Sequence, residues 1–139
     1  MKNTFGNNIS ITLFGESHGE AIGAILDGLP AGITVDEEFI SNQLQLRKSI
    51  GDISTPRKEK DEYKFLSGVF NGKTTGTPIC VVIPNENTQS KDYSANYGKA
   101  RPGHADLSGG LKYNHKDLRN VLERASARET AARVAAGAV

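Results

Sequence analysis

Residues 9–26 read ISITLFGESHGEAIGAIL, and this stretch decides the fold of the first part of the chain. Residues 9–14 alternate apolar and polar side chains, which is typical of a strand that buries one face. Residues 15–19, GESHG, have glycine at both ends and therefore predict a turn. Residues 21–26 continue as a second apolar strand. The stretch as a whole predicts an antiparallel β-hairpin that carries His18 at its tip.

A helix is predicted after this hairpin. Asp36 fits a helix N-cap, and the two acids that follow it suit the positive end of the helix dipole. The helix should end near Arg47 and bury a stripe made of Phe39, Ile40, Leu44 and Leu46. Residues 47–61 are polar and basic and predict a loop.

Two further strands are predicted in the middle of the chain. Residues 63–70 alternate in polarity, and Asn71-Gly72 begins a turn after them. Residues 78–84 enclose the apolar run ICVVI between two prolines, which predicts a strand buried on both faces with Cys80 inside it. Residues 85–115 are polar and predict a long loop, and a loop of this length in a compact domain is usually either functional or a wrong assignment.

Helices are predicted for the last part of the chain. Residues 116–123 predict a short helix, and Ser126-Ala127-Arg128-Glu129 has the spacing of a capping box. The alanine-rich run 130–139 favours a helix that packs closely in a core. Because this run reaches the last residue without a terminating signal except one glycine, we expect residues 1–139 to be part of a single domain that is cut within an element. The predicted class is α+β, with antiparallel β-hairpins packed on helices.

The composition narrows the class of protein. No run of about 18 apolar residues is present, so no membrane span is expected. The single cysteine excludes an intrachain disulfide, and no secretory signal is expected, which together favour a cytoplasmic protein. Three histidines and one cysteine lack the spacing of metal ligands, so no metal site is expected. The formal net charge of +1 gives no argument for a nucleic-acid partner.

Two histidines lie in loops that suit acid–base chemistry. His18 lies between a serine and a glycine, and glycine lets a ligand approach the backbone closely. His104 lies in Arg101-Pro102-Gly103-His104-Ala105-Asp106, where Arg101 can hold an anion and Asp106 can orient the imidazole. Each loop is also compatible with an ordinary polar turn, but two such loops in one small domain favour a site. His115 has no such setting and is expected on the surface.

Basic residues could hold an anionic ligand near these loops. Residues 1–40 carry one lysine and six acids, whereas residues 41–139 carry sixteen lysines and arginines and ten acids. Arginine forks match phosphate and carboxylate oxygens, and a helix start attracts anions. For any single one of these residues, however, a solvated surface charge is the simpler explanation. The candidates are Arg47, Lys48, Arg57, Arg124, Ser126, Arg128 and Arg133, of which Arg133 could instead pair with Glu129 one turn before it.

The motifs, taken in order, resemble the chorismate synthase family over essentially the whole chain. The matching stretches are FGESHG (14–19), DGLPAG (27–32), TPRKE (55–59), LSGVF (66–70), GKTTGTPI (72–79), SKDY (90–93), RPGHAD (101–106) and SARETA (126–131). The resemblance implies a lyase that eliminates phosphate from 5-enolpyruvylshikimate 3-phosphate to give chorismate, with reduced FMN and in some members NADPH as the reductant. It also implies a homotetramer and a sandwich of helices between antiparallel sheets, of which this chain would form a part that is inactive alone.

The resemblance assigns roles to individual residues. His18 and His104 would be the site histidines, one assisting protonation of the reduced flavin and the other protonating the leaving phosphate. FMN contacts are expected from Arg47, Arg124, Ala125 and Ser126. Substrate contacts are expected from Ser17, Arg47, Lys48, Arg57, Arg101, Arg128 and Arg133. The family often has serine where Ala125 stands, and Asp52 replaces a basic pattern, so neither position is a firm contact. The alternatives are a phosphate-binding module without catalysis and an RNA-binding domain, which lacks clustered aromatic residues.

Overall fold

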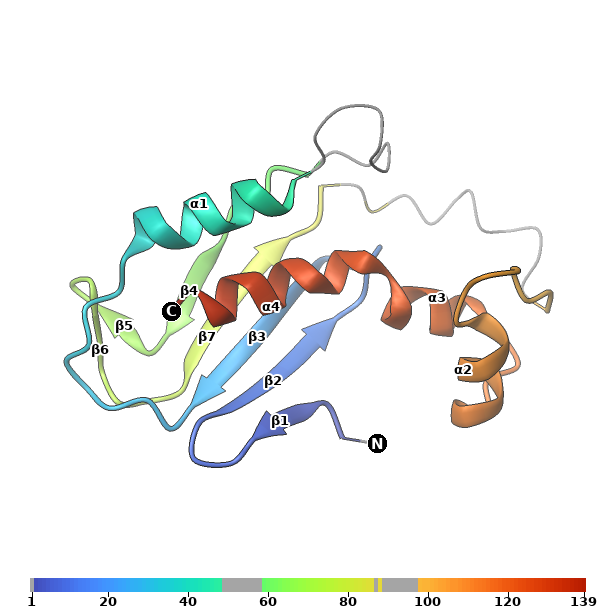
Figure 1. The fold of residues 1–139 in the computed structure, drawn as a ribbon, viewed down its shortest axis with the longest axis horizontal. Coiled ribbons are helices and arrows are strands. Elements are labelled where there is room, and N and C mark those ends of the chain that lie inside the picture. The colour runs from blue at the N-terminus through green and yellow to red at the C-terminus, as the bar shows by residue number, and fades with distance from the viewer. Residues whose placement is uncertain (1, 49–58, 87, 89–97) are drawn as a thin grey trace.

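The central element is a five-stranded antiparallel sheet with the strand order β1-β2-β3-β7-β4. The computed structural model describes residues 2–48, 59–86, 88 and 98–139. The strands of the sheet are β1 (Thr4–Gly6), β2 (Ser10–Gly15), β3 (Ala21–Asp27), β4 (Lys64–Ser67) and β7 (Ile79–Pro84). Helices cover one face of it (Figure 1). The predicted α+β class, with antiparallel strands packed on helices, is confirmed.

The predicted β2–β3 hairpin forms the middle of the sheet. Ser10 pairs with Asp27 and Gly15 with Ile22, so the strands pair along their whole length. Gly15 has a φ of +96°, and a Cβ there would lie 2.2 Å from the carbonyl oxygen of Ala21. Only glycine therefore fits at the point where the chain enters the loop that carries His18.

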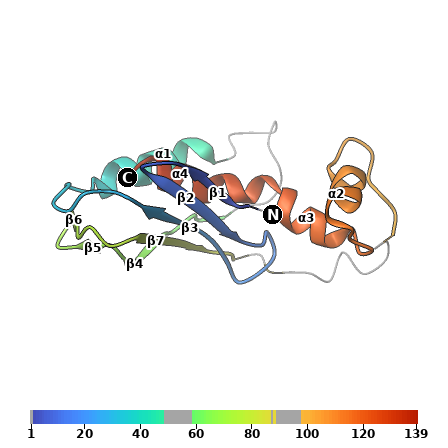
Figure 2. The same ribbon diagram turned by 90° about the horizontal axis from the view of Figure 1, so that it is seen from below.

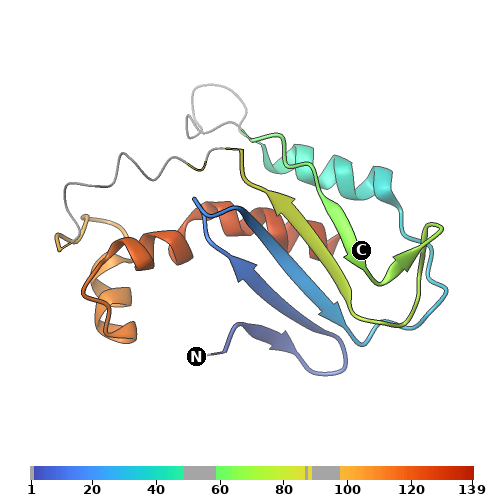
Figure 3. The same cartoon turned by 180° about the vertical axis from the view of Figure 1, so that it is seen from behind.

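Two helices, α1 (Glu37–Arg47) and α4 (Thr130–Gly137), lie side by side on one face of the sheet (Figures 1 and 2). Asp36 caps α1 as predicted, because its carboxylate accepts a hydrogen bond of 2.9 Å from the backbone N–H of Phe39. Figure 3 shows the molecule from behind, where the sheet lies in front of both helices. No helix among the described residues is long and apolar enough to cross a membrane.

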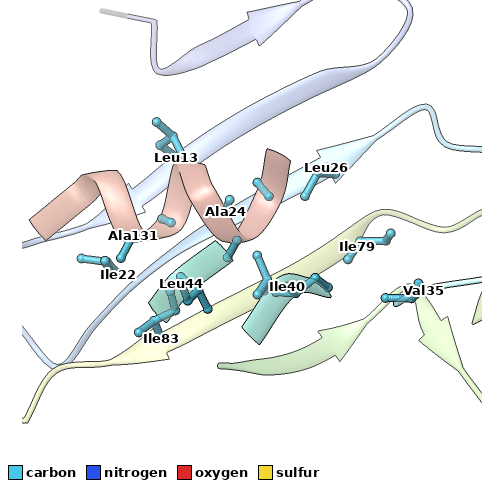
Figure 4. Packing of buried hydrophobic residues seen from close by; sticks show 14 residues of the cluster. Leu13, Ile22, Ala24, Leu26, Val35, Ile40, Leu44, Ile79, Ile83 and Ala131 are labelled. Atoms are coloured by element: carbon cyan, nitrogen blue, oxygen red, sulfur yellow. The ribbon is translucent and has the colours of Figure 1, made fainter. Parts of the chain in front are cut away.

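The core lies between these helices and the sheet (Figure 4). The predicted alanine-rich helix is buried there, and its small side chains allow α4 to approach the sheet closely. Each of the three central strands contributes every second side chain to this core, as expected for a sheet covered on one face. The buried apolar residues include Leu13, Ile22, Ala24, Leu26, Ile40, Leu44, Ile79, Val81, Ile83, Ala131, Ala132, Ala135 and Ala136.

Two details of the predicted core are wrong. On α1 only Ile40 and Leu44 are buried, whereas Phe39 is 47% and Leu46 72% exposed. Residues four apart share a helix face, and this short helix presents just one narrow stripe to the sheet. In β7 the side chains at 79, 81 and 83 are buried, but Cys80 is only partly buried, because it points to the face of the sheet opposite the helices. Burial nevertheless raises the pKa of the Cys80 thiol.

The predicted strand 63–70 is divided by Gly68, whose φ is +82°. β4 ends before this glycine, and β5 (Val69–Phe70) pairs with β6 (Lys73–Thr74) in a separate hairpin. Asn71 and Gly72 both have positive φ, as a two-residue type I′ turn requires. The predicted turn is confirmed, and the single strand is corrected to two short ones.

The polar segment 85–115, predicted as a loop, contains helix α2 (Asp106–Tyr113). Its large apolar residues, Leu107 and Leu111, are exposed, whereas its buried residues are Asp106, Gly109 and Gly110. The buried face of this helix is therefore not marked by a stripe of apolar residues in the sequence. The helix predicted at 116–123 is observed as α3 (Arg119–Ala125) and is followed by the 3-10 helix η3 (Ala127–Glu129). Figure 1 shows α2 and α3 at one end of the molecule, beyond the end of α4.

A pair of substitutions on α1 tests which leucine belongs to the core. Leu44→Ala should lower the free energy of unfolding by about 2–5 kcal/mol, because it leaves a cavity against the sheet. Leu46→Ala, on the same helix, should change it by no more than about 0.5 kcal/mol. Urea unfolding of both variants gives the two values, and equal losses would contradict the observed orientation of α1.

Candidate functional site

The loop that carries His18 lies at the end of the sheet next to α3 (Figure 1). Two backbone carbonyls of this loop, those of Glu16 and Gly19, accept hydrogen bonds from the side-chain amide of Asn85, at 3.0 Å and 2.8 Å. A single carboxamide, that of Asn85, therefore binds both ends of the loop. This fixes the backbone on either side of the histidine.

His18 forms a pair with Glu123 of α3. Its ring Nδ1 lies 3.0 Å from one oxygen of the Glu123 carboxylate, and its backbone N–H donates to the other oxygen at 2.7 Å. The side chains of both residues are mostly buried, with 12% and 15% exposed. A carboxylate only accepts, so the ring hydrogen lies on Nδ1 and proton exchange with a ligand falls to Nε2.

Ser17 joins the same loop to the start of η3. Its hydroxyl donates to the hydroxyl of Ser126 at 2.8 Å, and its backbone N–H donates to the carbonyl of Glu123. The predicted contact Ser126 is thus brought to Ser17 and His18, although it lies more than one hundred residues after them in the chain.

His104 forms a second pair, with Asp106 at the start of α2. Its Nδ1 lies 2.7 Å from Asp106 Oδ1, and Arg101 donates to both oxygens of the same carboxylate through Nε and Nη2. Arg101 Nη2 also lies 2.9 Å from Nδ1, but a nitrogen that donates to Asp106 cannot accept from the guanidinium. The predicted orientation of His104 by Asp106 is therefore present, again with the hydrogen on Nδ1.

The charge of Asp106 is stabilised by its neighbours. The Arg101 guanidinium, which donates to Asp106, holds the pKa of that carboxyl well below its usual range, and the hydrogen bond from His104 acts in the same direction. Burial opposes this, since it favours the neutral acid. Asp106 is therefore an anion throughout the neutral range and remains an acceptor for the imidazole.

Helix α3 supports both histidines. Glu123 near its end contacts His18, while α2 packs against its first turn through two glycines. A Cβ on Gly109 would lie 2.3 Å from Val121 Cγ1, and one on Gly110 would lie 2.5 Å from Leu118 Cδ2. The two glycines therefore let the side chains of Val121 and Leu118 pack directly on the backbone of α2, and a side chain at either position would displace them.

Two of the predicted substrate contacts, Arg47 and Arg128, meet in a buried cluster. Arg47 Nη1 donates to Asp61 Oδ2 at 2.7 Å, and Arg128 Nη1 pairs with Asp61 Oδ1. The Asp61 side chain is completely buried, and that of Arg128 is 2% exposed. Arg47 is 21% exposed, and its buried Nε has no hydrogen-bond partner among the described residues. Arg47 thus keeps donor capacity at Nε, whereas Arg128 has a protein acceptor at each of its three nitrogens.

The remaining basic candidates lie nearer the surface. Arg124 donates to Asn3 Oδ1 and pairs with Glu129, and Arg133 pairs with the same carboxylate at 3.0 Å, as predicted. Because Glu129 faces these two arginines, the predicted capping box is not formed, and Ser126 instead accepts from the backbone N–H of Arg128.

Other predicted positions vary in their exposure. Lys48 is half-buried at the end of α1, Ala125 is exposed, and His115 is exposed as expected. Arg57 and Asp52 lie outside the described residues.

Three functional residues were not predicted from the sequence: Glu123, Asp61 and Asn85. Each is a polar residue whose partner is distant in the chain, by 105 positions for Glu123 and His18 and by 67 for Asp61 and Arg128. Asn85 directly follows a buried strand, which is the one local signal that could have indicated it. Among the described residues no group of three or more histidines, cysteines, aspartates or glutamates could hold a metal ion.

The sequence profile of the family described as chorismate synthase matches residues 9–139. The chain belongs to the chorismate synthase family. Chorismate synthases of Campylobacter fetus and Sulfurimonas denitrificans are 53% and 55% identical to it over 136 and 138 residues, which are 98% and 99% of the chain. A crystal structure of chorismate synthase, 43% identical, superposes with a TM-score of 0.68 over 95% of the chain and 32% of its own length. The chain spans 38% of the length of these curated chorismate synthases.

The Asp106 carboxylate gives this member of the chorismate synthase family a pH-dependent term in its stability. Since its pKa is lowered on folding, the contribution is complete above the ordinary aspartate pKa of about 3.9 and is lost as the pH falls further toward the folded value. Asp106→Asn should therefore lower the unfolding free energy by about 1–3 kcal/mol at pH 7 and by less at pH 3.

Urea unfolding at the two pH values measures this difference. Asp117→Asn is the matched control, because Asp117 forms a half-exposed pair with Arg119 and should contribute no more than about 1 kcal/mol. A loss from Asp106→Asn that is the same at both pH values would contradict the assigned role of the charge.

Proposed function

We propose that the protein to which this chain belongs is a lyase that eliminates phosphate from 5-enolpyruvylshikimate 3-phosphate to form chorismate, a step of the shikimate pathway toward aromatic amino acids. The observation that carries the proposal is the pair of histidines that each hold Nδ1 on a carboxylate, His18 on Glu123 and His104 on Asp106. Family membership supplies the reaction. Since the chain spans 38% of its relatives' length, we propose that it is inactive alone.

The geometry of the two pairs suits a reaction that moves protons at a phosphate. The elimination breaks one C–O bond and one C–H bond, so a phosphate group and a proton leave the substrate. A carboxylate on Nδ1 fixes the orientation of an imidazole and supports positive charge on it, which makes Nε2 a proton donor at a defined position. In the proposal one histidine protonates the leaving phosphate, and the other would assist protonation of the reduced flavin.

Basic residues of the chain would receive the anionic substrate. Arg101 lies beside His104 and is half-exposed, and Arg47 keeps an unpartnered Nε among the described residues. Guanidinium groups bind phosphate and carboxylate oxygens with directed hydrogen bonds. Ser17, Lys48, Arg57 and Arg133 belong to the same proposed set. Arg128 belongs to this set too, and its buried contacts with Asn85, Asp61 and the carbonyl of Pro84 also make it part of the support of the site.

The segment Arg124-Ala125-Ser126 fits a place where reduced FMN could be held. Helix α3 ends at Ala125, which is exposed and has a small side chain, and the chain bends at Ser126 with a ψ of 142°. Ser126 is hydrogen-bonded to the loop of His18, so a flavin here would lie near a proton donor. Reduced FMN would supply electrons that are returned within the turnover, so the reaction has no net redox change. NADPH as the reductant, a homotetramer and a cytoplasmic location are parts of the same proposal, supported by the family relationship.

Alanine variants of the histidines test the proposed function. In the full-length protein, with reduced FMN and 5-enolpyruvylshikimate 3-phosphate, His18→Ala and His104→Ala should each lower kcat by about 10²–10⁴-fold, as removal of a positioned acid or base does. His115→Ala is the control and should leave kcat unchanged, because His115 is exposed and its ring lies beside that of Tyr113 at the end of α2.

Chorismate formation at the parental rate by either variant would contradict the assigned role of that histidine. Binding of the phosphorylated substrate by the parent protein without any product would instead favour a phosphate-binding module that lacks catalysis. Calorimetric titration with the substrate distinguishes this outcome from a protein that does not bind it.

A further inference from the structure

Asn85 lies where the end of β7 meets the loop that carries His18, and the proposed reaction gives it no role. It directly follows β7, is 8% exposed, and its backbone N–H donates to the carbonyl of Glu20 at 2.9 Å. The β7 strand pairs with β3, with Pro84 opposite Ala21, so the residue after Pro84 reaches the loop that carries His18. The sheet thus places this side chain beneath the histidine loop.

The carboxamide of Asn85 has all its main hydrogen-bonding positions occupied. Its two Nδ2 hydrogens are donated to the carbonyls of Glu16 and Gly19, and its Oδ1 accepts from Arg128 Nε at 2.8 Å. The carbonyls can only accept and the guanidinium can only donate, so the orientation of the amide is fixed by its neighbours. An aspartate at this position would keep the acceptor for Arg128 but would have no donor for the two carbonyls.

Arg128 continues this set of contacts to a predicted substrate residue. Its Nη1 pairs with Asp61, and its Nη2 donates to the carbonyl of Pro84 at 3.2 Å. The second oxygen of Asp61 accepts from Arg47 at 2.7 Å. An uninterrupted series of hydrogen bonds therefore runs from both ends of the His18 loop to the guanidinium of Arg47.

We propose that Asn85 is a positioning residue that couples the orientation of the His18 loop to that of Arg47 through Arg128 and Asp61. The inference rests on the proposed function, because it assigns Asn85 to the site that would carry it out. Asn85 does not touch the substrate in this proposal; it acts through His18 on one side and through Arg47 on the other. Arg128 accordingly takes part in the support of the site.

The test compares Asn85→Asp with Asn42→Asp in the full-length protein. Asn42 is exposed on α1, so its variant makes the same chemical change without the buried contacts and should keep the parental kcat. Asn85→Asp should lower kcat by about 10-fold or more, since it removes the donors of two buried hydrogen bonds. In a His18→Ala background the same substitution should cause a smaller fold-loss than in the parent, because the part of its effect that passes through His18 is already lost, while the part that passes through Arg47 remains.

An equal fold-loss in both backgrounds would overturn the proposal, since that result indicates general destabilisation. A second measurement does not need turnover: the ¹⁵N shifts of the His18 ring should indicate an Nδ1–H tautomer in the parent and a changed tautomer mixture in Asn85→Asp. An unchanged His18 spectrum in that variant would also overturn it. If the parent protein forms no chorismate, the proposed function fails, and the ring spectrum still decides whether Asn85 positions His18.

Discussion

The ion pair between Arg128 and Asp61 is the interaction on which the part of the site around His18 and Arg47 depends. Both side chains are almost completely buried, and burying two charges costs several kcal/mol that their attraction must offset. The pair is surrounded by further partners, because Asp61 also accepts from Arg47 and Arg128 also donates to Asn85 and to the carbonyl of Pro84. We expect such a cluster to contribute less to net stability than to a defined geometry. It fixes three segments of the chain, at the end of α1, just before β4 and at η3, against one another.

Each of the two histidines is oriented by a carboxylate at Nδ1, but the two carboxylates lie at different distances along the chain. His18 is oriented by a carboxylate 105 residues away, so its pair exists only when the hairpin and α3 are both in place. His104 is oriented by a carboxylate two residues away, so its pair is local. The position of the whole loop that carries His104, in contrast, depends on the contact of α2 with α3 through Gly109 and Gly110. Helix α3 is therefore the common reference for both histidines.

The sequence predicts the parts of this molecule that are decided by short-range patterns. The hairpin around residues 15–19 follows from alternation and glycine, the cap at Asp36 follows from hydrogen-bonding chemistry, and the core helix α4 follows from its alanines. Helix α2 could not be predicted, because it packs through glycines and exposes its leucines, which reverses the usual pattern of an amphipathic helix. Likewise Glu123 has no local signal for its role, and Asn85 has only its place directly after a buried strand, since a polar residue acquires a partner only when the chain folds.

The His18 contact joins residues far apart in the chain, whereas the His104 contact is local. Substitutions near the two histidines are therefore expected to affect folding to different degrees. Disturbing Glu123 or Asn85 alters buried groups of the main domain, so effects on His18 and on folding are expected to overlap. Disturbing the contact between α2 and α3 moves His104 while the five-stranded sheet and its covering helices remain, because α2 contributes no residue to the main core. The part of the site around His104 is therefore the one whose position can change without loss of the fold. The part around His18 is held to the end of the sheet by Asn85 and to α3 by Glu123.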